Sequence, residues 1–183
     1  SDIDYAAEHG YVIKLIGRAK KYSDDKITAT VGPCLIPNHS QLSNVDDVFN
    51  AILVRGDAIG DVVFYGRGAG KFPTASAVVA DIIDCARHNT KRRLFGWDCA
   101  EDNYVMDPLM ATSSLYVRAE ADDYVAAFNE INSVFESPLI LHRDGESKNE
   151  IAFITPSMRE KEARTAISKL PIKTELILRV MDY

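Results

Sequence analysis

The sequence predicts an α+β fold in two parts: a mixed or antiparallel sheet with helices on one face, followed by a compact βαββαβ unit. Two runs of paired strands and one helical run occupy the first half. Residues 88–112 then lose hydrophobic periodicity, and the remaining residues alternate strands with helices. We therefore expect one domain over residues 1–88, a linker over 89–112 and a second domain over 113–183.

The chain opens on a short helical segment. Asp2 or Asp4 is the expected N-cap, because a carboxylate accepts the free amides of a first turn, and Gly10 is the expected stop. A natural gene product begins with Met, whereas this chain begins with Ser1. We therefore expect an excised fragment of a longer polypeptide.

Two β-hairpins follow the first helix. The first is expected to pair residues 11–20 with residues 27–37 across a polar corner. The second is expected to pair residues 48–54 with residues 58–66 around the sequence RGD, where Gly56 can take the positive φ that such a turn requires.

A glycine-rich loop leads from the second hairpin into a helix. The stretch FYGRGAG, residues 64–70, places three glycines within five positions, and glycine permits positive φ and close approach of other groups to the backbone. Pro73 suits a helix start, and Thr74 is the expected cap. The helix is expected to turn one apolar stripe against a sheet: Ala75, Val78, Val79, Ile82 and Ala86.

The glycine loop matches neither standard nucleotide motif. A dinucleotide fingerprint, G-x-G-x-x-G, needs its third glycine where Lys71 or Pro73 stands. A phosphate-binding P-loop needs a glycine at Tyr65 and a hydroxyl at Phe72. Two interpretations therefore stay open: a tight strand-to-helix connection, or a helix amino terminus whose unpaired amides face an anionic or amide-bearing ligand.

The strands of the second half follow a compact pattern. Residues 113–121 alternate as a strand, residues 138–144 and 150–156 form a hairpin, and residues 172–183 close as a final strand. With one helix after the first strand and one after the hairpin, the order is that of the ferredoxin-like split unit.

The two helices of the second half are recognised by their periodicity. The second of them is expected to begin with Ser157 as cap and Glu160 three residues later, which is a capping box. Both helices carry apolar stripes at helical spacing: Tyr124, Phe128, Ile131 and Phe135 in the first, and Ala163, Ala166, Ile167 and Leu170 in the second.

Charge and composition exclude several classes of function. The net charge is −6, which argues against a nucleic-acid interface, because phosphate binding needs clustered Lys and Arg. No apolar run approaches the roughly 20 residues of a membrane helix, and no signal segment opens the chain. We therefore expect a soluble, cytoplasmic protein without membrane partners. Three well-separated cysteines, Cys34, Cys85 and Cys99, predict reduced thiols and no metal site.

The first half also resembles a known protein family in several short sequence segments. The segments FNAI, GDAIG, FYGRGAG and PTASAVVADI, between Gly10 and Asp84, are similar to the later part of the catalytic domain of bacterial homoserine dehydrogenases. In that family an ACT regulatory domain can follow, and from Thr112 onward the order of elements resembles one. The resemblance assigns residues 1–88 to the end of the catalytic and dimerisation domain, and residues 113–183 to an ACT-like domain.

The resemblance implies an oxidoreductase that interconverts aspartate semialdehyde and homoserine with NADP or NAD and without a catalytic metal, in threonine, methionine and isoleucine biosynthesis. In that family the Rossmann glycines and the residues for substrate binding and proton transfer precede the position of Ser1. No catalytic residue is therefore expected here, and the chain alone should be inactive. The family's glycine loop lies against the cofactor, which implies cofactor-binding roles for Gly68, Ala69 and Gly70, with Thr74 as a helper.

The resemblance also implies partners. We expect a homodimer that forms across the two hairpins, because an isologous contact hides sheet edges. An ACT domain often binds an amino acid, here threonine, at the turn between its first strand and first helix. That turn contains neither Pro nor Gly, and Asp122 with Asp123 would repel a ligand carboxylate. The alternative function is a stand-alone amino-acid-binding or dimerisation module, and a Rossmann fingerprint upstream of Ser1 would favour the enzyme.

Overall fold

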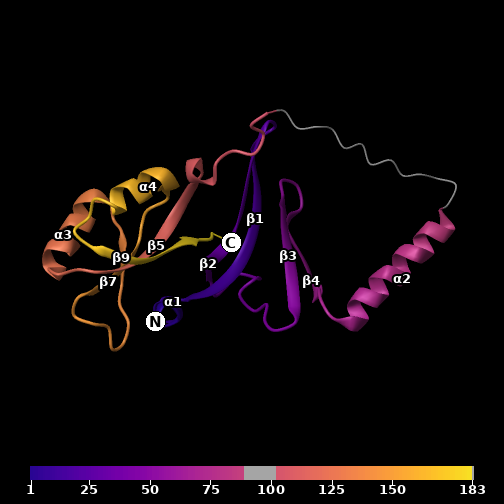
Figure 1. Cartoon of the computed structure of the whole chain (residues 1–183), viewed down its shortest axis with the longest axis horizontal. Coiled ribbons are helices and arrows are strands. Elements are labelled where there is room, and N and C mark those ends of the chain that lie inside the picture. Colours follow the sequence, from indigo (N-terminus) through magenta and orange to yellow (C-terminus); the bar gives the residue numbers. More distant parts are fainter. Residues whose placement is uncertain (89–101, 183) are drawn as a thin grey trace. The chain divides into compact units, whose positions relative to one another are not determined.

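The structure is a computed structural model that describes residues 1–88 and 102–182 (Figure 1). The described residues form two compact units, residues 1–43 with 102–182 and residues 44–88. Both units combine helices with strands, which confirms the α+β class. These units follow contacts in space, and the domain boundaries expected at residues 88 and 113 stay a prediction.

The elements of the larger unit are α1 (Asp2–Glu8), β1 (Tyr11–Ser23), β2 (Lys26–Pro37), the 3-10 helix η1 (Pro108–Met110), β5 (Thr112–Glu120), α3 (Tyr124–Val134), β6 (Leu139–Leu141), β7 (Glu150–Ile154), β8 (Met158–Arg159), α4 (Glu160–Ile167) and β9 (Lys173–Val180). The smaller unit contains β3 (Phe49–Gly56), β4 (Gly60–Arg67) and α2 (Lys71–Arg87). Both predicted hairpins are present, as β1 with β2 and β3 with β4.

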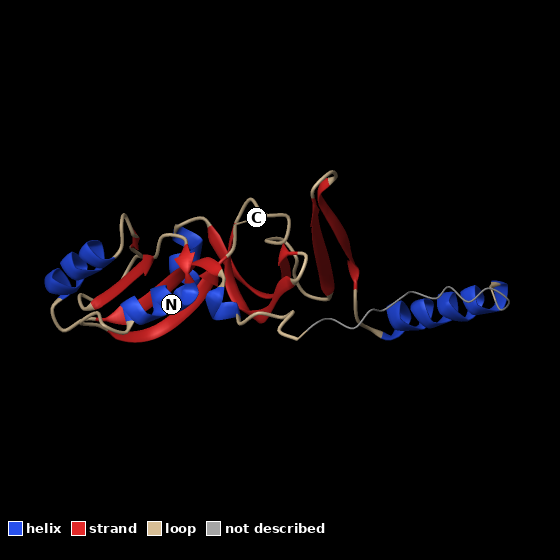
Figure 2. Ribbon diagram, turned by 90° about the horizontal axis from the view of Figure 1, so that it is seen from above, coloured by secondary structure: helices blue, strands red, loops and turns tan. Residues whose placement is uncertain are grey.

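One sheet runs through the larger unit in the strand order β1-β2-β9-β5-β7-β6, with β8 pairing the start of β5 (Figures 1 and 2). The second half follows the expected order β-α-β-β-α-β, with the short β8 inserted before α4. The sequence did not indicate the join between β2 and β9. These strands are parallel and meet through two residue pairs, Cys34 with Arg179 and Leu35 with Val180.

Alternating residues of β5 direct two apolar clusters to opposite faces of this sheet. Leu115, Val117 and Ala119 belong to a core that is closed by α3 and α4, because Ala127, Ile131, Ala163 and Ile167 pack in the same cluster. Tyr116 points to the other face and packs with Tyr5 of α1 and Leu35 of β2. The sheet is therefore covered by helices on both faces, and the prediction of helices on one face only is wrong, because α1 packs on the face opposite α3 and α4.

Part of the predicted linker is ordered in the larger unit. Residues 89–101, with Cys99, lie outside the described residues. After them, the Ile27 amide donates to the Tyr104 carbonyl at 3.0 Å and the Met106 amide donates to the Ile27 carbonyl at 2.9 Å. This stretch therefore runs beside β2 in a one-residue parallel bridge between Ile27 and Val105.

The predicted cap of α4 is wrong. The helix begins at Glu160 and its N-cap residue is Arg159, because Met158 and Arg159 are held extended by pairing with β5. Ser157 lies before that short strand. Glu160 is instead buried, and its carboxylate accepts hydrogen bonds from Arg164 at 2.8 Å and from Arg179 at 2.7 Å.

Two other local predictions need correction. The positive φ of the second hairpin belongs to Gly60, at +72°, and not to Gly56, because the left-handed residue follows the three-residue loop rather than preceding it. At the start of the chain the N-cap of α1 is Ser1, not Asp2 or Asp4. The predicted stop is confirmed, since Gly10 has a φ of +77° directly after the end of the helix.

The smaller unit consists of the β3–β4 hairpin and the helix α2. The helix forms where it was expected, but none of its side chains is buried among the described residues. Its apolar stripe is open, with Val78 53% and Ile82 62% exposed. The predicted packing of this stripe against a sheet is therefore absent from the described part of the chain.

Candidate functional site

The glycine loop connects the end of β4 to the start of α2 (Figure 1). The strand ends at Arg67, the helix begins at Lys71, and the three residues between them are exposed. Gly70 is the N-cap of α2 and has a φ of +118°, a value that residues with a side chain rarely adopt. The loop can therefore make this turn only with glycine at position 70.

Gly68 is fixed by a different constraint. Asn50 of β3 stands opposite Gly66 in the hairpin ladder, and its side chain reaches over Gly68. A β-carbon at position 68 would lie well inside 3.0 Å of the Asn50 amide nitrogen. A β-carbon at Gly66 would meet nothing within 4 Å. Close approach of Asn50 therefore requires glycine at one of these positions and not at the other.

The amino terminus of α2 is open. No side chain caps it, and no acidic residue lies in its first turn. The expected cap, Thr74, lies inside the helix: its amide donates to the Gly70 carbonyl at 3.1 Å. The cap prediction is therefore wrong, because α2 begins earlier than Pro73 indicated. The amides of Lys71 and Phe72 precede the first intrahelical bond and are the natural donors for an anion.

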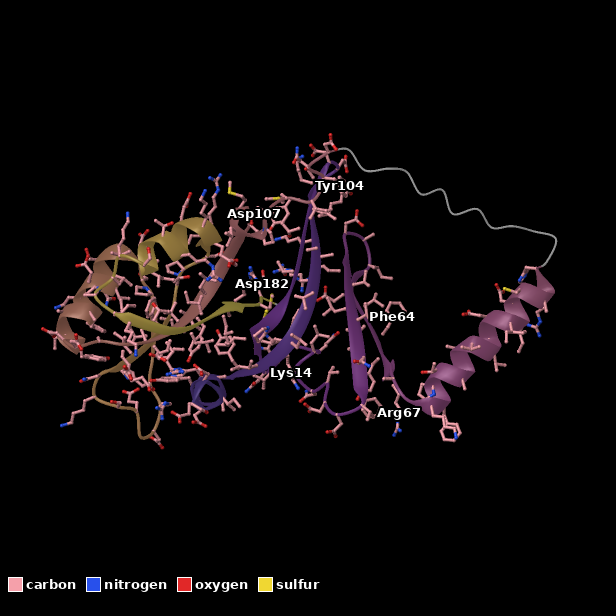
Figure 3. All side chains as sticks on the ribbon, viewed as in Figure 1. Lys14, Phe64, Arg67, Tyr104, Asp107 and Asp182 are labelled. Carbon is pink, nitrogen blue, oxygen red and sulfur yellow. The ribbon has the colours of Figure 1, made fainter. Side chains whose placement is uncertain are left out.

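Two cations flank the loop, and sequence reasoning did not single them out. Arg67 at the end of β4 places its guanidinium 5.4 Å from the centre of the Phe49 ring, and Phe49 stacks on Tyr65 at 5.0 Å. Lys71 places its ammonium 5.9 Å from the centre of the Phe72 ring. Arg67 is labelled in Figure 3, and β4, the strand that carries it, is labelled in Figure 1. The signal was present in the sequence, where R-G-A-G-K brackets the glycines with basic residues.

The predicted site residues Gly68, Ala69, Gly70 and Thr74 thus lie together in one exposed loop and the first turn of α2. Positive charge comes from the helix amino terminus and from both flanking side chains. The arrangement can hold an anionic group against bare backbone. The cofactor role of these four residues stays a prediction.

The turn between β5 and α3 is where an amino-acid effector was expected to bind. In the structure, a side chain of the turn itself caps the helix that follows. The Asp123 carboxylate accepts a hydrogen bond from the Ala126 amide at 3.0 Å and so caps α3. Asp122 next to it is exposed. A ligand carboxylate at this turn would have to displace one acid and approach another, which is unfavourable.

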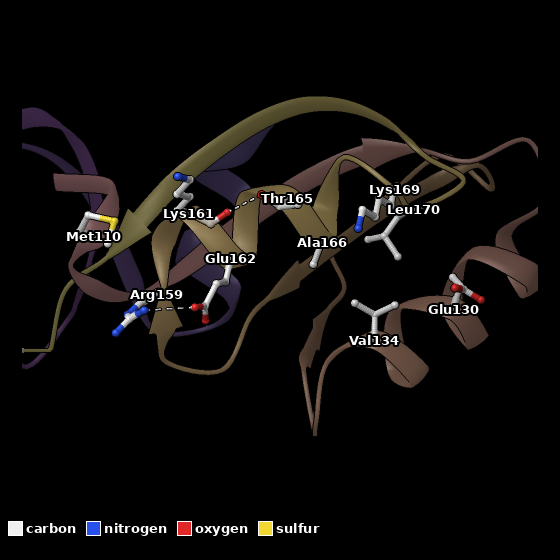
Figure 4. Close-up of a pocket in the computed structure, with 10 residues that line it drawn as sticks. All are labelled: Met110, Glu130, Val134, Arg159, Lys161, Glu162, Thr165, Ala166, Lys169 and Leu170. Atoms are coloured by element: carbon white, nitrogen blue, oxygen red, sulfur yellow. Dashed lines mark hydrogen bonds and ion pairs between the residues drawn. The ribbon is translucent and has the colours of Figure 1, made fainter. Parts of the chain in front are cut away.

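A groove lies between α3 and α4 (Figure 4). This α3–α4 groove has a volume of about 670 Å³, within the range of small-molecule sites. Its lining combines apolar side chains with charged side chains of both signs. The residues are Met110, Glu130, Val134, Arg159, Lys161, Glu162, Thr165, Ala166, Lys169 and Leu170.

Within residues 1–88 and 102–182, no three His, Cys, Asp or Glu side chains gather closely enough to hold a metal ion. No helix in the described part of the chain is long and apolar enough to span a bilayer. Of the described cysteines, Cys85 is exposed and Cys34 is buried. Burial raises the pKa of the Cys34 thiol, although Arg179 and Arg18 oppose this.

The region in which this chain is similar to known proteins includes the glycine loop. The family model described as homoserine dehydrogenase matches residues 1–83, which include the whole glycine loop. A homoserine dehydrogenase of Neisseria gonorrhoeae is 37% identical over 183 aligned residues, which cover 92% of this chain and 42% of that protein. One from Helicobacter pylori is 36% identical over 92% of this chain and 41% of its own length.

Solved structures of homoserine dehydrogenases are also similar to this chain. A crystal structure of a homoserine dehydrogenase from Thiobacillus denitrificans aligns with a TM-score of 0.83 and 34% identity, covering 99% of this chain and 45% of that one. The S. aureus homoserine dehydrogenase at pH 6.0 aligns with a TM-score of 0.76 and 30% identity, covering 100% and 45%. The chain therefore spans less than half the length of the relatives that it matches.

Proposed function

Because the homoserine dehydrogenase family model matches residues 1–83 and the chain is similar to such enzymes along nearly its whole length, we propose that it works as the rear part of a homoserine dehydrogenase in the cytoplasm. The complete enzyme interconverts aspartate semialdehyde and homoserine with NADP or NAD. The share of this chain is a cofactor-facing loop, a subunit interface and a regulatory region.

The observation that carries the proposal is the construction of the glycine loop. A side chain at position 68 would have to displace the exposed side chain of Asn50, and one at position 70 would be strained by the backbone φ of +118°. The result is a stretch of bare backbone that ends in an uncapped helix, between Arg67 and Lys71. A nicotinamide cofactor supplies a hydride and carries phosphates. This loop offers the phosphates positive charge and lets the substrate approach the ring closely.

Open apolar faces support the proposed homodimer. In the larger unit, Leu15 and Val31 lie on one face of the β1–β2 hairpin and are 75% and 79% exposed. In the smaller unit, Ile52 and Phe64 stand directly opposite each other and are 65% and 63% exposed. Contiguous apolar patches of this kind mark interaction sites. A second copy of the chain is the proposed occupant.

The ACT-like assignment rests on strand order. Read along the sheet, β9-β5-β7-β6 places the first and third strands of the βαββαβ unit at the centre, which is the ferredoxin-like arrangement. Regulation by an amino acid such as threonine follows from this likeness. The Asp123 cap argues against the β5–α3 turn as the place of binding.

The α3–α4 groove supports a second candidate, a stand-alone amino-acid-binding module. Glu130 of α3 and Lys169, which follows α4, offer opposite charges to a zwitterion, and Val134 and Leu170 line the same groove with apolar side chains. Calorimetry of the chain with single amino acids tests it. A heat of binding that is measured for the wild type and disappears in Lys169→Ala would support the amino-acid-binding module. The absence of any heat of binding at millimolar amino acid would exclude it.

The enzyme proposal is tested with a chimera. The amino-terminal part of the Neisseria gonorrhoeae relative is joined to this chain at the aligned position, and oxidation of NADPH or NADH by aspartate semialdehyde is followed by absorbance. We expect turnover from the chimera and none from either part alone. A folded chimera that binds the cofactor but does not reduce the aldehyde would contradict the proposal.

A further inference from the structure

Helix α1 is fastened to a part of the chain far away in sequence. Tyr5 is fully buried, and its hydroxyl donates to the Glu150 carboxylate at 2.8 Å and lies 3.2 Å from the Glu146 carboxylate. Burial and the neighbouring Glu150 raise the pKa of Tyr5 far above its ordinary value, so its hydroxyl stays a donor at neutral pH. The helix is thereby attached to the loop between β6 and β7, residues 142–149.

Glu150 is the centre of this attachment. One of its oxygens accepts two hydrogen bonds from the Arg143 guanidinium, at 2.7 and 3.0 Å, and the bond from Tyr5. Its other oxygen lies 3.9 Å from the Arg118 guanidinium. Arg143 also lies over the Tyr5 ring at 5.2 Å from its centre. Removing the charge of Glu150 would therefore deprive the Arg143 guanidinium of its ion-pair partner and replace a charged acceptor of the Tyr5 hydroxyl by a weaker neutral one.

Both ends of α1 carry further polar contacts to the same region. At its start, Asp2 accepts hydrogen bonds from Arg118 at 2.7 Å and from the Tyr116 hydroxyl at 2.9 Å. Just after its end, Nε2 of the His9 ring lies 2.8 Å from the backbone carbonyl oxygen and 3.0 Å from the backbone nitrogen of His142. The helix is thus held by β5 at one end and by the 142–149 loop at the other.

The same loop touches the turn between β5 and α3. The Ala121 amide donates to the Asn149 carbonyl at 2.8 Å, and Glu120 stands opposite Glu150 in the strand ladder. Asp123, two residues after Ala121, caps α3. A displacement of this turn therefore acts on the residue that adjoins Glu150.

We propose that Glu150 couples the β5–α3 turn to α1, so that a change at the turn loosens or tightens the helix. The coupling runs from Ala121 through Asn149 to Glu150, and from Glu150 to Tyr5 of α1. As an account of regulation it rests on the proposed function. As a property of the fold it stands on these contacts alone.

The design of α1 makes a local release feasible. Only Tyr5 and Ala6 of this helix are buried. The core under α3 and α4 is built without any residue of α1. A helix with so few buried contacts can open while the remainder of the unit stays folded. Loss of the Glu150 contacts should therefore be felt at α1 and not across the whole unit.

The test is hydrogen exchange on the whole chain, with Glu150→Gln compared with Glu120→Gln. The control makes the same chemical change at the paired position, where Glu120 is exposed and its only described ion pair is with Lys173. We expect the amides of α1 to exchange roughly 10- to 100-fold faster in Glu150→Gln, with β5 and α4 unchanged. The control should leave α1 as in the wild type.

Coupling to the turn needs a second variant. Asp123→Ala removes the cap of α3 and, as a single substitution, should raise the exchange rate of the α1 amides by at least about twofold. Added to Glu150→Gln, the same substitution should cause no further rise. Unchanged exchange of α1 in Glu150→Gln, an equal rise in every element, or no effect of Asp123→Ala on α1 would each overturn the proposal. The measurement needs no turnover, so its failure leaves the enzyme proposal intact.

Discussion

Asn50 of β3 lies so close over Gly68 that no side chain can be added there without moving one of the two. Gly66, two residues earlier on β4, has no such neighbour. The hairpin thus provides two nearby positions, one near the end of β4 and one in the loop after it, where the same substitution has different physical consequences.

The first prediction uses this pair. Gly68→Ala should lower the free energy of unfolding by about 0.5–1 kcal/mol, because the added methyl group displaces the exposed side chain of Asn50. Gly66→Ala should change it by no more than about 0.5 kcal/mol. Urea unfolding followed by circular dichroism gives both values. Equal effects of the two substitutions would show that Asn50 does not cover Gly68.

The second prediction concerns the buried carboxylate of α4. Glu160→Gln should cost about 2–3 kcal/mol of unfolding free energy, because Arg164 and Arg179 both lose a charged acceptor. Glu162→Gln is the matched control, since that side chain is 59% exposed and forms one long ion pair at 3.6 Å. Thermal unfolding of both variants measures the two losses of stability. Similar losses in the two would remove the special role of Glu160.

The third prediction is a pH dependence. Burial alone would raise the pKa of Glu150, but hydrogen bonds from Arg143 and Tyr5 outweigh it and lower the pKa below the ordinary 4.5. Burial is likewise outweighed at Asp2, where Arg118 lowers the pKa below 3.8. A lowered carboxyl pKa contributes stability above the unfolded-state value that is lost as the pH falls through the folded-state value.

Stability from these groups should therefore be complete above about pH 4.5 and decline below it. Urea midpoints measured at pH 6, 4 and 3 test this. Glu150→Gln should lose less stability between pH 6 and pH 3 than the wild type does. An identical decline in both would mean that Glu150 does not contribute.

The fourth prediction separates two thiols. Cys34 is 2% exposed and burial raises its pKa, so it should stay unmodified by a thiol reagent at neutral pH, while Cys85 reacts. Mass spectrometry of peptides after timed labelling measures both sites in one sample. Fast labelling of Cys34 in the folded chain would contradict its placement in the core.

Local pattern predicted most of the secondary structure, and long-range contacts explain what it missed. Alternation and helical spacing placed both hairpins, α2, α3 and α4. The parallel join of β2 to β9 depends on two residue pairs between distant segments, and no period in the sequence reports it. The cap of α4 was misplaced for the same reason, because pairing with β5 keeps Arg159 extended.

The candidate site was likewise predictable only in part from the sequence. The glycines and the start of α2 could be read from residue types, and the family resemblance selected Gly68, Ala69, Gly70 and Thr74. The constraint on Gly68 comes from Asn50 on another strand, which only the folded hairpin reveals. The contacts of Tyr5 with Glu150 join residues 145 positions apart and were not predictable from local pattern.

The central claim is that the glycine loop faces the cofactor, and hydrogen exchange of the chimera with and without NADPH tests it most directly. We predict slower exchange of the amides between Gly68 and Thr74 when NADPH is bound, and a weaker effect in Gly68→Ala than in Gly66→Ala. Cofactor binding that protects amides elsewhere in the chimera and leaves this loop unchanged would contradict the claim.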